Sequence, residues 1–313
     1  MCSIGIFLGE ASSRYSFPDH PMNVSRIEPF KQKLREEFGN KENVKIMEPI
    51  TASEDVLLLF HTKEYIDFVK KASEHGFGYL DYGDTPAFKG VFEASTYVVG
   101  STLFGLDMIM KKELDHVFNP VGGVHHARRD RAAGFCVFND ASIAIVHAEK
   151  TYGLKRILYV DIDAHHGDGV CYEFYDDPKV FIADIHEDGR YLYPGTGFSH
   201  ETGSGKAEGT KLNIPLKLGA GDEEFKEAFT RVEEFAHQTK PELIIFQCGA
   251  DGLENDPLTH LRYTEEVHKY STKKLHEISH ELCDGRIMAL GGGGYNPNNV
   301  AKAWIEVIKG FLG

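Results

Sequence analysis

The stretch Ile157-Leu158-Tyr159-Val160-Asp161-Ile162-Asp163-Ala164-His165-His166-Gly167-Asp168 decides the fold of this chain. Its first four residues are apolar, which predicts a short buried strand. Because side chains of a strand alternate between its two faces, we expect Asp161, Asp163 and His165 to point the same way. Buried carboxylates need a cation or hydrogen-bonding partners, and imidazole with carboxylate ligands favours zinc, with iron(II) as the close competitor. The alternative is a polar strand end that water solvates in a loop.

Other apolar runs predict further strands, with helices between them. Strands are expected over residues 4–8, 117–118, 180–185, 243–246 and 287–290. Helices are expected after Ser25, between Thr62 and Gly76, over 88–110 and around 225–235, with Ser25 and Thr62 as N-caps. The strands are apolar without clean alternation, which indicates a parallel sheet covered on both faces.

Polar or glycine-rich segments follow four of the expected strands. They are residues 119–126 (NPVGGVHH), 161–168 (DIDAHHGD), 247–251 (QCGAD) and 291–295 (GGGGY). Sites in parallel sheets gather beyond the carboxyl ends of the strands, so these segments are expected to form one site.

Each of these features is ambiguous alone. A pair such as His125-His126 is more often structural than catalytic, and Asp251 could be a helix N-cap. The glycine run 291–294 matches neither the dinucleotide fingerprint nor a phosphate-binding loop. Four further histidines lie in helical stretches with no spacing partner and are treated as surface or packing residues: His75, His237, His276 and His280.

Composition limits the domain count and the class of protein. The 313 residues are 42% hydrophobic and contain no linker-like, repeated or low-complexity segment, which predicts one domain over residues 1–313. No signal peptide or transmembrane run is evident, so a cytoplasmic protein without membrane contact is expected. Five scattered cysteines without a C-x-x-C pair argue against a disulfide framework and a thiolate zinc site. A net charge of −14 disfavours nucleic-acid binding and would favour cationic ligands.

Five segments together resemble the zinc-dependent histone deacetylase superfamily, which includes acetoin-utilization proteins and acetylpolyamine amidohydrolases. The segments are GGVHHA (122–127), GFCVFND (134–140), DIDAHHGDG (161–169), GAD (249–251) and LGGGGY (290–295). They occur in the family's order and span nearly the whole chain. The resemblance implies a prokaryote-like, single-domain α/β protein of the arginase/deacetylase-like fold, with a central, mostly parallel sheet flanked by helices.

The resemblance also implies the residues of a zinc-dependent deacetylase site. The implied metal ligands are Asp163, His165 and Asp251, for Zn²⁺ or Fe²⁺. The implied catalytic residues are His125, His126, Asp161, Asp168 and Tyr295. The implied substrate-binding residues are Asp84, Gly134, Phe135, Tyr193 and Leu258.

The implied catalytic residues have distinct roles. His126 would act as general base on a water molecule and then protonate the leaving amine. His125 would tune the electrostatics, and Tyr295 would hydrogen-bond to the developing oxyanion. Asp161 and Asp168 would be the carboxylate partners of His125 and His126, respectively.

The substrate-binding residues imply a tunnel for an acetylated lysine side chain. Phe135 and Tyr193 correspond to its aromatic walls, and Gly134 to the backbone beside the methylene stem. Asp84 corresponds to a rim aspartate that binds substrate backbone amides, although it could equally be a turn residue. Arg26 resembles an arginine that lines an internal acetate channel.

Three hypotheses for the function follow. The first is deacetylation of acetyl-lysine in proteins or peptides, and the second is deacetylation of small amines such as acetylpolyamines. Leu258 favours the first, because polyamine-selective members carry an acidic residue there. The third reading is a non-catalytic acetyl-binding protein, but no chemical residue is missing. Leu253 stands where a binuclear, arginase-like site needs a second carboxylate, so one catalytic metal is expected.

Structural potassium is a further implication of the resemblance. Asp184 replaces the serine of many eukaryotic relatives at one potassium site, where it could still coordinate an alkali cation. A second potassium site would use the backbone carbonyls of Phe174, Asp177 and Val180. The sequence leaves open the physiological substrate, the native metal and the oligomeric state.

Overall fold

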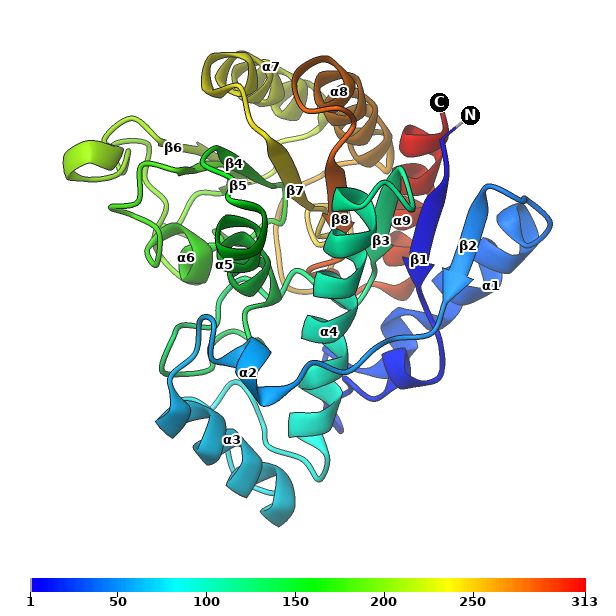
Figure 1. Cartoon of the computed structure of the whole chain (residues 1–313), viewed down its shortest axis with the longest axis vertical. Helices are drawn as coiled ribbons and strands as arrows, with labels where there is room; N and C mark the ends of the chain where they lie inside the picture. Colours follow the sequence, from blue (N-terminus) through cyan, green and yellow to red (C-terminus); the bar gives the residue numbers. More distant parts are fainter. Residues whose placement is uncertain (1) are drawn as a thin grey trace.

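A computed structural model of the chain describes residues 2–313 and contains one sheet of eight parallel strands (Figure 1). The strands are β1 (Ile4–Phe7), β2 (Val44–Met47), β3 (His116–Asn119), β4 (Ile157–Asp161), β5 (Val180–Glu187), β6 (Lys211–Leu216), β7 (Leu243–Gln247) and β8 (Ile287–Leu290). Their order across the sheet is β2-β1-β3-β8-β7-β4-β5-β6. The predicted single-domain, parallel α/β architecture is confirmed.

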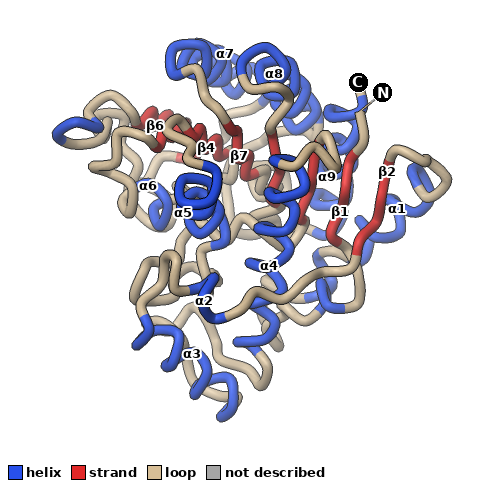
Figure 2. The backbone as a smooth tube through the Cα atoms, in the orientation of Figure 1, coloured by secondary structure: helices blue, strands red, loops and turns tan. Residues whose placement is uncertain are grey.

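Helices connect the strands and cover both faces of the sheet. They are α1 (Glu28–Phe38), α2 (Glu54–Leu57), α3 (Lys63–His75), α4 (Val91–Met110), α5 (Asp140–Tyr152), α6 (Asp168–Cys171), α7 (Asp222–Thr239), α8 (Glu266–Leu282) and α9 (Pro297–Leu312). Helices α1, α7, α8 and α9 lie on one face, and α4 and α5 lie on the other (Figure 2). No helix within residues 2–313 is both long enough and apolar enough to span a membrane.

The sheet has a hydrophobic core on each face because its central strands are mainly apolar. In β4, Leu158 and Val160 pack into the core formed with α1, α7, α8 and α9. Ile157 and Tyr159, which point the other way, pack into the core formed with α3, α4 and α5. The first four residues of β4 are all apolar, as is typical of a strand buried on both faces. The carboxylates therefore begin only where β4 ends.

The helix boundaries agree in part with the sequence predictions. Thr62 caps α3 by accepting a hydrogen bond from the backbone N–H of Tyr65, and Gly76 ends that helix with φ of +73°. The prediction of Ser25 as the cap of the first helix is wrong. Ser25 lies in the 3₁₀ turn Val24–Arg26, and α1 begins at Glu28.

Two strands were not predicted, and both lie at the edges of the sheet. The side chains of Lys45 and Ile46 in β2 are exposed, because β2 has a neighbour on one side only. Strand β6 begins with Lys211 and contains Pro215, which removes a backbone donor and is tolerated at an edge. Neither segment has the apolar run of a central strand.

Candidate active site

The predicted metal ligands meet beyond the carboxyl ends of β4 and β7. Asp163 and His165 lie in the loop after β4, and Asp251 lies in the turn after β7. Nδ1 of His165 is 3.1 Å from Oδ1 of Asp163 and 2.9 Å from Oδ2 of Asp251. All three side chains are buried.

This cluster fits a divalent metal. One ligand atom from each of Asp163, His165 and Asp251 lies within 4.8 Å of the others. Burial and the charge of Asp163 raise the pKa of Asp251 to about 7, so two ionised carboxylates here need a positive charge between them. Three protein ligands of oxygen and nitrogen, with room for substrate, form a donor set suited to catalytic zinc.

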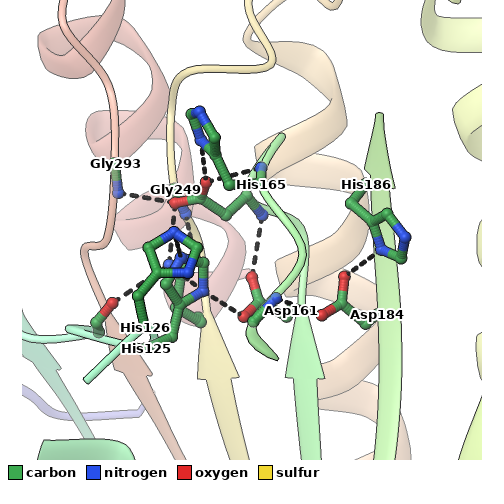
Figure 3. A network of polar contacts seen from close by, with 12 residues as sticks. His125, His126, Asp161, His165, Asp184, His186, Gly249 and Gly293 are labelled. Carbon is green, nitrogen blue, oxygen red and sulfur yellow. Dashed lines mark hydrogen bonds and ion pairs between the residues drawn. The ribbon is translucent and has the colours of Figure 1, made fainter. Parts of the chain in front are cut away.

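Hydrogen bonds from neighbouring strand ends orient Asp163. The backbone N–H of Gly293 and Nε2 of Gln247 donate to its Oδ2 at 2.8 and 2.9 Å (Figure 3). Sequence reasoning did not assign a role to Gln247, although it is the first residue of the QCGAD segment after β7. Its position at a strand end was the available signal.

Asp161 does not belong to the metal cluster, contrary to the expectation from strand alternation. Its Oδ2 accepts a hydrogen bond from Nδ1 of His125 at 2.8 Å (Figure 3). It also accepts one from the hydroxyl of Tyr159 at 2.6 Å. Asp161 is the last residue of β4, so the alternation of the strand does not extend to Asp163 and His165.

The tandem histidines lie together, each against a carboxylate. Nδ1 of His126 is 2.7 Å from Oδ1 of Asp168, and Nε2 of His126 is 3.1 Å from Nε2 of His125. The other oxygen of Asp168 accepts a hydrogen bond from Arg128 at 2.8 Å. Arg128 was missed by sequence reasoning, because nothing local marks it as the partner of a residue 40 positions away.

The two histidines have opposite pKa shifts. Burial opposes protonation of His125, but the charge of Asp161 outweighs it and raises the pKa to about 9. Burial lowers the pKa of His126 to about 4, and the charge of His125 contributes to this change. The pair therefore carries a single charge at neutral pH, which lies on His125, and His126 is neutral.

Tyr295 lies just before α9 and faces the same pocket. Its backbone N–H donates to Oδ2 of Asp256 at 2.7 Å, and its ring packs edge-on against Phe135 with centroids 5.7 Å apart. Burial and the charge of Asp251 raise the pKa of Tyr295 well above 10. Its hydroxyl therefore keeps its proton and can donate a hydrogen bond.

A pocket of about 210 Å³ leads to these residues. The substrate-binding residues predicted from the resemblance all line it: Asp84, Gly134, Phe135, Tyr193 and Leu258. His126, His165 and Tyr295 also line it, so the chemical groups stand at its inner end. The pocket thus brings the predicted substrate-binding residues next to one predicted metal ligand, His165, and two predicted catalytic residues, His126 and Tyr295.

The pocket runs close to the backbone at Gly134, where a residue with a side chain does not fit. A Cβ atom there would lie 2.5 Å from Cδ2 of His126 and 2.9 Å from Tyr193. Gly134 has φ of +51° and Phe135 has φ of +67°, an uncommon conformation for a bulky side chain. Two hydrogen bonds hold Phe135: its N–H donates to Oγ1 of Thr85, and its carbonyl accepts from Tyr15.

Asp84 stands on the rim of the pocket in a turn that Asp81 organises. Oδ1 of Asp81 accepts hydrogen bonds from the backbone N–H groups of Gly83, Asp84 and Thr85, at 2.8 to 3.0 Å. Burial and the charge of Asp81 raise the pKa of Asp84. Asp84 therefore lies both in a turn and on the rim of the pocket, and the side chain that forms the turn is that of Asp81.

A second hollow lies behind the metal cluster, and Arg26 lines it together with His125 and His126. Nη2 of Arg26 donates to the carbonyl of Gly292 at 2.8 Å, and its Nε donates to the carbonyl of Gly294. The guanidinium is thus attached to the glycine run that precedes Tyr295.

Asp184 is buried and already has two partners. Nδ1 of His186 lies 2.6 Å from its Oδ1, and the N–H of Gly167 donates to its Oδ2 at 2.9 Å (Figure 3). An alkali cation beside Asp184 stays a prediction.

The second predicted potassium position is different, because a lysine ammonium contacts two of the carbonyls assigned to it. Nζ of Lys211 donates to the carbonyls of Val180 at 2.7 Å and Asp177 at 3.3 Å, and to Oγ1 of Thr210 at 2.6 Å. Burial lowers the pKa of Lys211 to about 8, so the side chain is mainly protonated at neutral pH. A potassium ion at this position stays a prediction, and the ammonium of Lys211 is the cation that contacts two of its carbonyls.

Comparisons with known proteins agree with one another. Residues 20–311 match the model of the histone deacetylase domain. The chain is 42% identical over 302 residues to acetoin utilization protein AcuC of Bacillus subtilis, which covers 92% of this chain and 78% of that protein. It is 34% identical over 296 residues to a probable deacetylase of Archaeoglobus fulgidus, covering 93% and 80%. A crystal structure of the HDA15 HD domain aligns with a TM-score of 0.90 at 26% identity, over 100% of this chain and 90% of that one.

Proposed function

Because the chain belongs to the histone deacetylase family, we propose that it is a zinc-dependent hydrolase that removes acetyl groups from lysine side chains of proteins or peptides. One observation carries this proposal. The His125-His126 pair and the Asp163–His165–Asp251 cluster stand together at the inner end of an aromatic-walled pocket. That pocket suits a long, thin side chain with a reactive group at its tip.

In this proposal Asp163, His165 and Asp251 hold the zinc ion. When bound, zinc would polarise the acetyl carbonyl and lower the pKa of a water molecule beside it. The ring of His126 packs near that of His165, with centroids 6.0 Å apart, which leaves its Nε2 close to the reacting atoms.

His126 then moves the protons. Because its pKa is lowered to about 4, it is neutral at physiological pH and can accept a proton from the attacking water at Nε2. Asp168 accepts the hydrogen bond from Nδ1, which fixes the ring and stabilises the imidazolium that forms. The same proton then passes to the leaving amine, which cannot depart as an anion.

Tyr295 stabilises the negative charge that develops on the carbonyl oxygen. It reaches the pocket as a neutral phenol, held by the bond from its backbone N–H to Asp256. A donor placed in advance lowers the barrier without reorganisation at the moment of reaction. His125, protonated and bound to Asp161, adds positive charge on the other side of His126.

The rim favours a peptide substrate. Asp84 offers an acceptor for backbone N–H groups, and Leu258 gives the mouth of the pocket an apolar side. A small acetylated amine remains the second candidate, because Asp81 and Asp84 make the rim acidic and the net charge of the chain is −14. The five cysteines are all free, which supports a cytoplasmic enzyme.

A substrate panel tests the proposal. Metal-free protein is reloaded with zinc, and release of acetate is measured from an acetyl-lysine peptide and from acetylspermidine. The proposal expects zinc-dependent turnover and a higher kcat/KM for the peptide. A tenfold preference for acetylspermidine, about 1.4 kcal/mol in the barrier, would replace the first candidate with the second. No turnover of either substrate at full zinc occupancy would contradict both.

A further inference from the structure

A second group of metal-binding side chains lies at the opposite end of the sheet. His116 is the first residue of β3, whereas the catalytic loop follows its last residue, Asn119. Beside His116 lie Cys2, next to β1, and two histidines of α8, His276 and His280. Both chain termini are on this side of the molecule (Figure 1). The cluster is therefore separate from the candidate active site.

The two helical histidines are placed by ordinary helix geometry. His276 and His280 are four residues apart, so they share one face of α8. Their ring centroids are 4.5 Å apart, and they lie 4.9 and 5.8 Å from the ring of His116. His280 is exposed and His276 is half-buried, which agrees with the prediction of surface or packing residues, but the two are spacing partners on one helix face.

Cys2 is held at the cluster by its neighbours. Nδ2 of Asn43 donates to the carbonyl of Cys2 at 2.9 Å. Ser3 donates to Oδ2 of Asp115 from its backbone N–H and from its hydroxyl, at 2.7 and 2.8 Å. The N–H of His116 donates to the carbonyl of Ser3 at 3.0 Å. Sγ of Cys2 lies 3.9 Å from Nε2 of His280.

The environment of His116 indicates that its ring binds a ligand. It has no exposed surface, yet neither of its ring nitrogens has a hydrogen-bond partner among residues 2–313. Nδ1 of His276 is buried and unpartnered as well. Buried polar atoms are normally satisfied, and simple packing against Phe311 does not supply a partner.

We propose that Cys2, His116, His276 and His280 form a second metal site, which binds one zinc-type divalent ion. Four nitrogen and sulfur ligands are the donor set of a closed, tetrahedral structural site, with no position left for substrate. One ligand atom from each residue lies within 4.8 Å of the others, and a tetrahedral zinc brings such atoms to about 3.5 Å. Binding displaces the thiol proton of Cys2 into solvent as the sulfur–metal bond forms.

The ion would join segments far apart in the sequence. It would tie Cys2, two residues before β1, and His116, at the start of β3, to α8, which packs against α9. Its role is structural, because the ligands lie away from the pocket. Metal binding to this site stabilises the folded chain by mass action.

Cobalt(II) distinguishes this site from the catalytic one. Only a site with a thiolate ligand gives a sulfur-to-cobalt charge-transfer band in the near ultraviolet, and the catalytic cluster contains no sulfur. Metal-free protein is titrated with Co²⁺, and the band is recorded together with the bound metal per chain. We expect the wild type to bind two cobalt ions per chain with a band from one of them, and the band should persist and saturate at one cobalt per chain in Asp251→Asn.

Substitutions of two of the proposed ligands complete the test. Cys2→Ser should abolish the band, and His280→Gln should weaken cobalt binding at this site at least tenfold. His75→Gln, which removes an exposed histidine of α3, is the matched control and should change neither. Zinc should raise the Tm of Asp251→Asn but not that of Asp251→Asn combined with Cys2→Ser. Folded wild-type protein without the band, or a band that survives Cys2→Ser, would overturn the proposal.

Discussion

Replacing Tyr295 by phenylalanine separates the oxyanion donor from the rest of the site. The substitution keeps the ring that packs against Phe135 and the backbone bond to Asp256. No group within residues 2–313 hydrogen-bonds to the hydroxyl, so its removal leaves no partner unsatisfied. The free energy of unfolding should therefore change by no more than about 0.5 kcal/mol.

The expected loss lies in the chemical step. A single preorganised donor to an oxyanion contributes about 10²–10³ in kcat, or about 2.7–4 kcal/mol. Because burial and Asp251 keep the phenol protonated, the loss should be similar across neutral and mildly alkaline pH. Zinc content and KM for an acetyl-lysine peptide should remain near those of the wild type.

The assay is single-turnover acetate release, with zinc measured on the same sample. Tyr191→Phe is the matched control, because Tyr191 is an exposed tyrosine close to the pocket mouth and should tolerate the change. An unchanged single-turnover rate for Tyr295→Phe, at full zinc occupancy, would remove Tyr295 from the mechanism. An equal loss in both variants would point to a general effect on folding or on the rim.

Three further perturbations test other parts of the structure. Asp163→Ala and His165→Ala should each lose bound zinc and activity together, because three protein ligands leave none spare, and full zinc by elemental analysis would refute the ligand assignment. Burial lowers the pKa of His61 from 6.5 to about 3 in the folded protein. Below pH 6.5 the unfolded chain therefore binds a proton that the folded chain does not. The stability that is present at neutral pH is lost as the pH falls from 6.5 towards 3. In urea denaturation, the free energy of unfolding of the wild type should fall between pH 7 and pH 5, and His61 should account for about 2 kcal/mol of that fall. His61→Gln should lack this part of the pH dependence. Asp84→Ala should reduce kcat/KM for an acetyl-lysine peptide, and Leu258→Glu should move the preference towards acetylspermidine; unchanged substrate ratios in both variants would contradict the rim roles.

The central strands and the location of the site could be predicted from the sequence for the same reason. A strand buried on both faces, such as β4, is mainly apolar, and the polar residues of a site lie at or beyond its carboxyl end. The edge strands β2 and β6 could not be predicted this way, because one open side relaxes that demand. Strand alternation wrongly grouped Asp161 with Asp163 and His165, since alternation does not continue beyond the end of a strand, whereas the family resemblance paired Asp161 with His125, which it contacts.

Partners supplied by the fold were the hardest to predict. Arg128 meets Asp168, and Gln247 meets Asp163, only after loops from different strands converge. The spacing of His276 and His280 was readable as one helix face. Nothing in the sequence brings them to His116, because that contact depends on how α8 packs against the sheet.

Lys211 changes how part of this protein responds to its surroundings. An ion held only by carbonyls equilibrates with the medium, so its occupancy follows the concentration and the identity of the salt. An ammonium on a side chain cannot be diluted away or exchanged for sodium, and it stays at the carbonyls of Asp177 and Val180 in any buffer. It can be lost only by deprotonation, for which the pKa of about 8 sets the limit. At this position the chain is therefore insensitive to the composition of the salt and sensitive to alkaline pH instead.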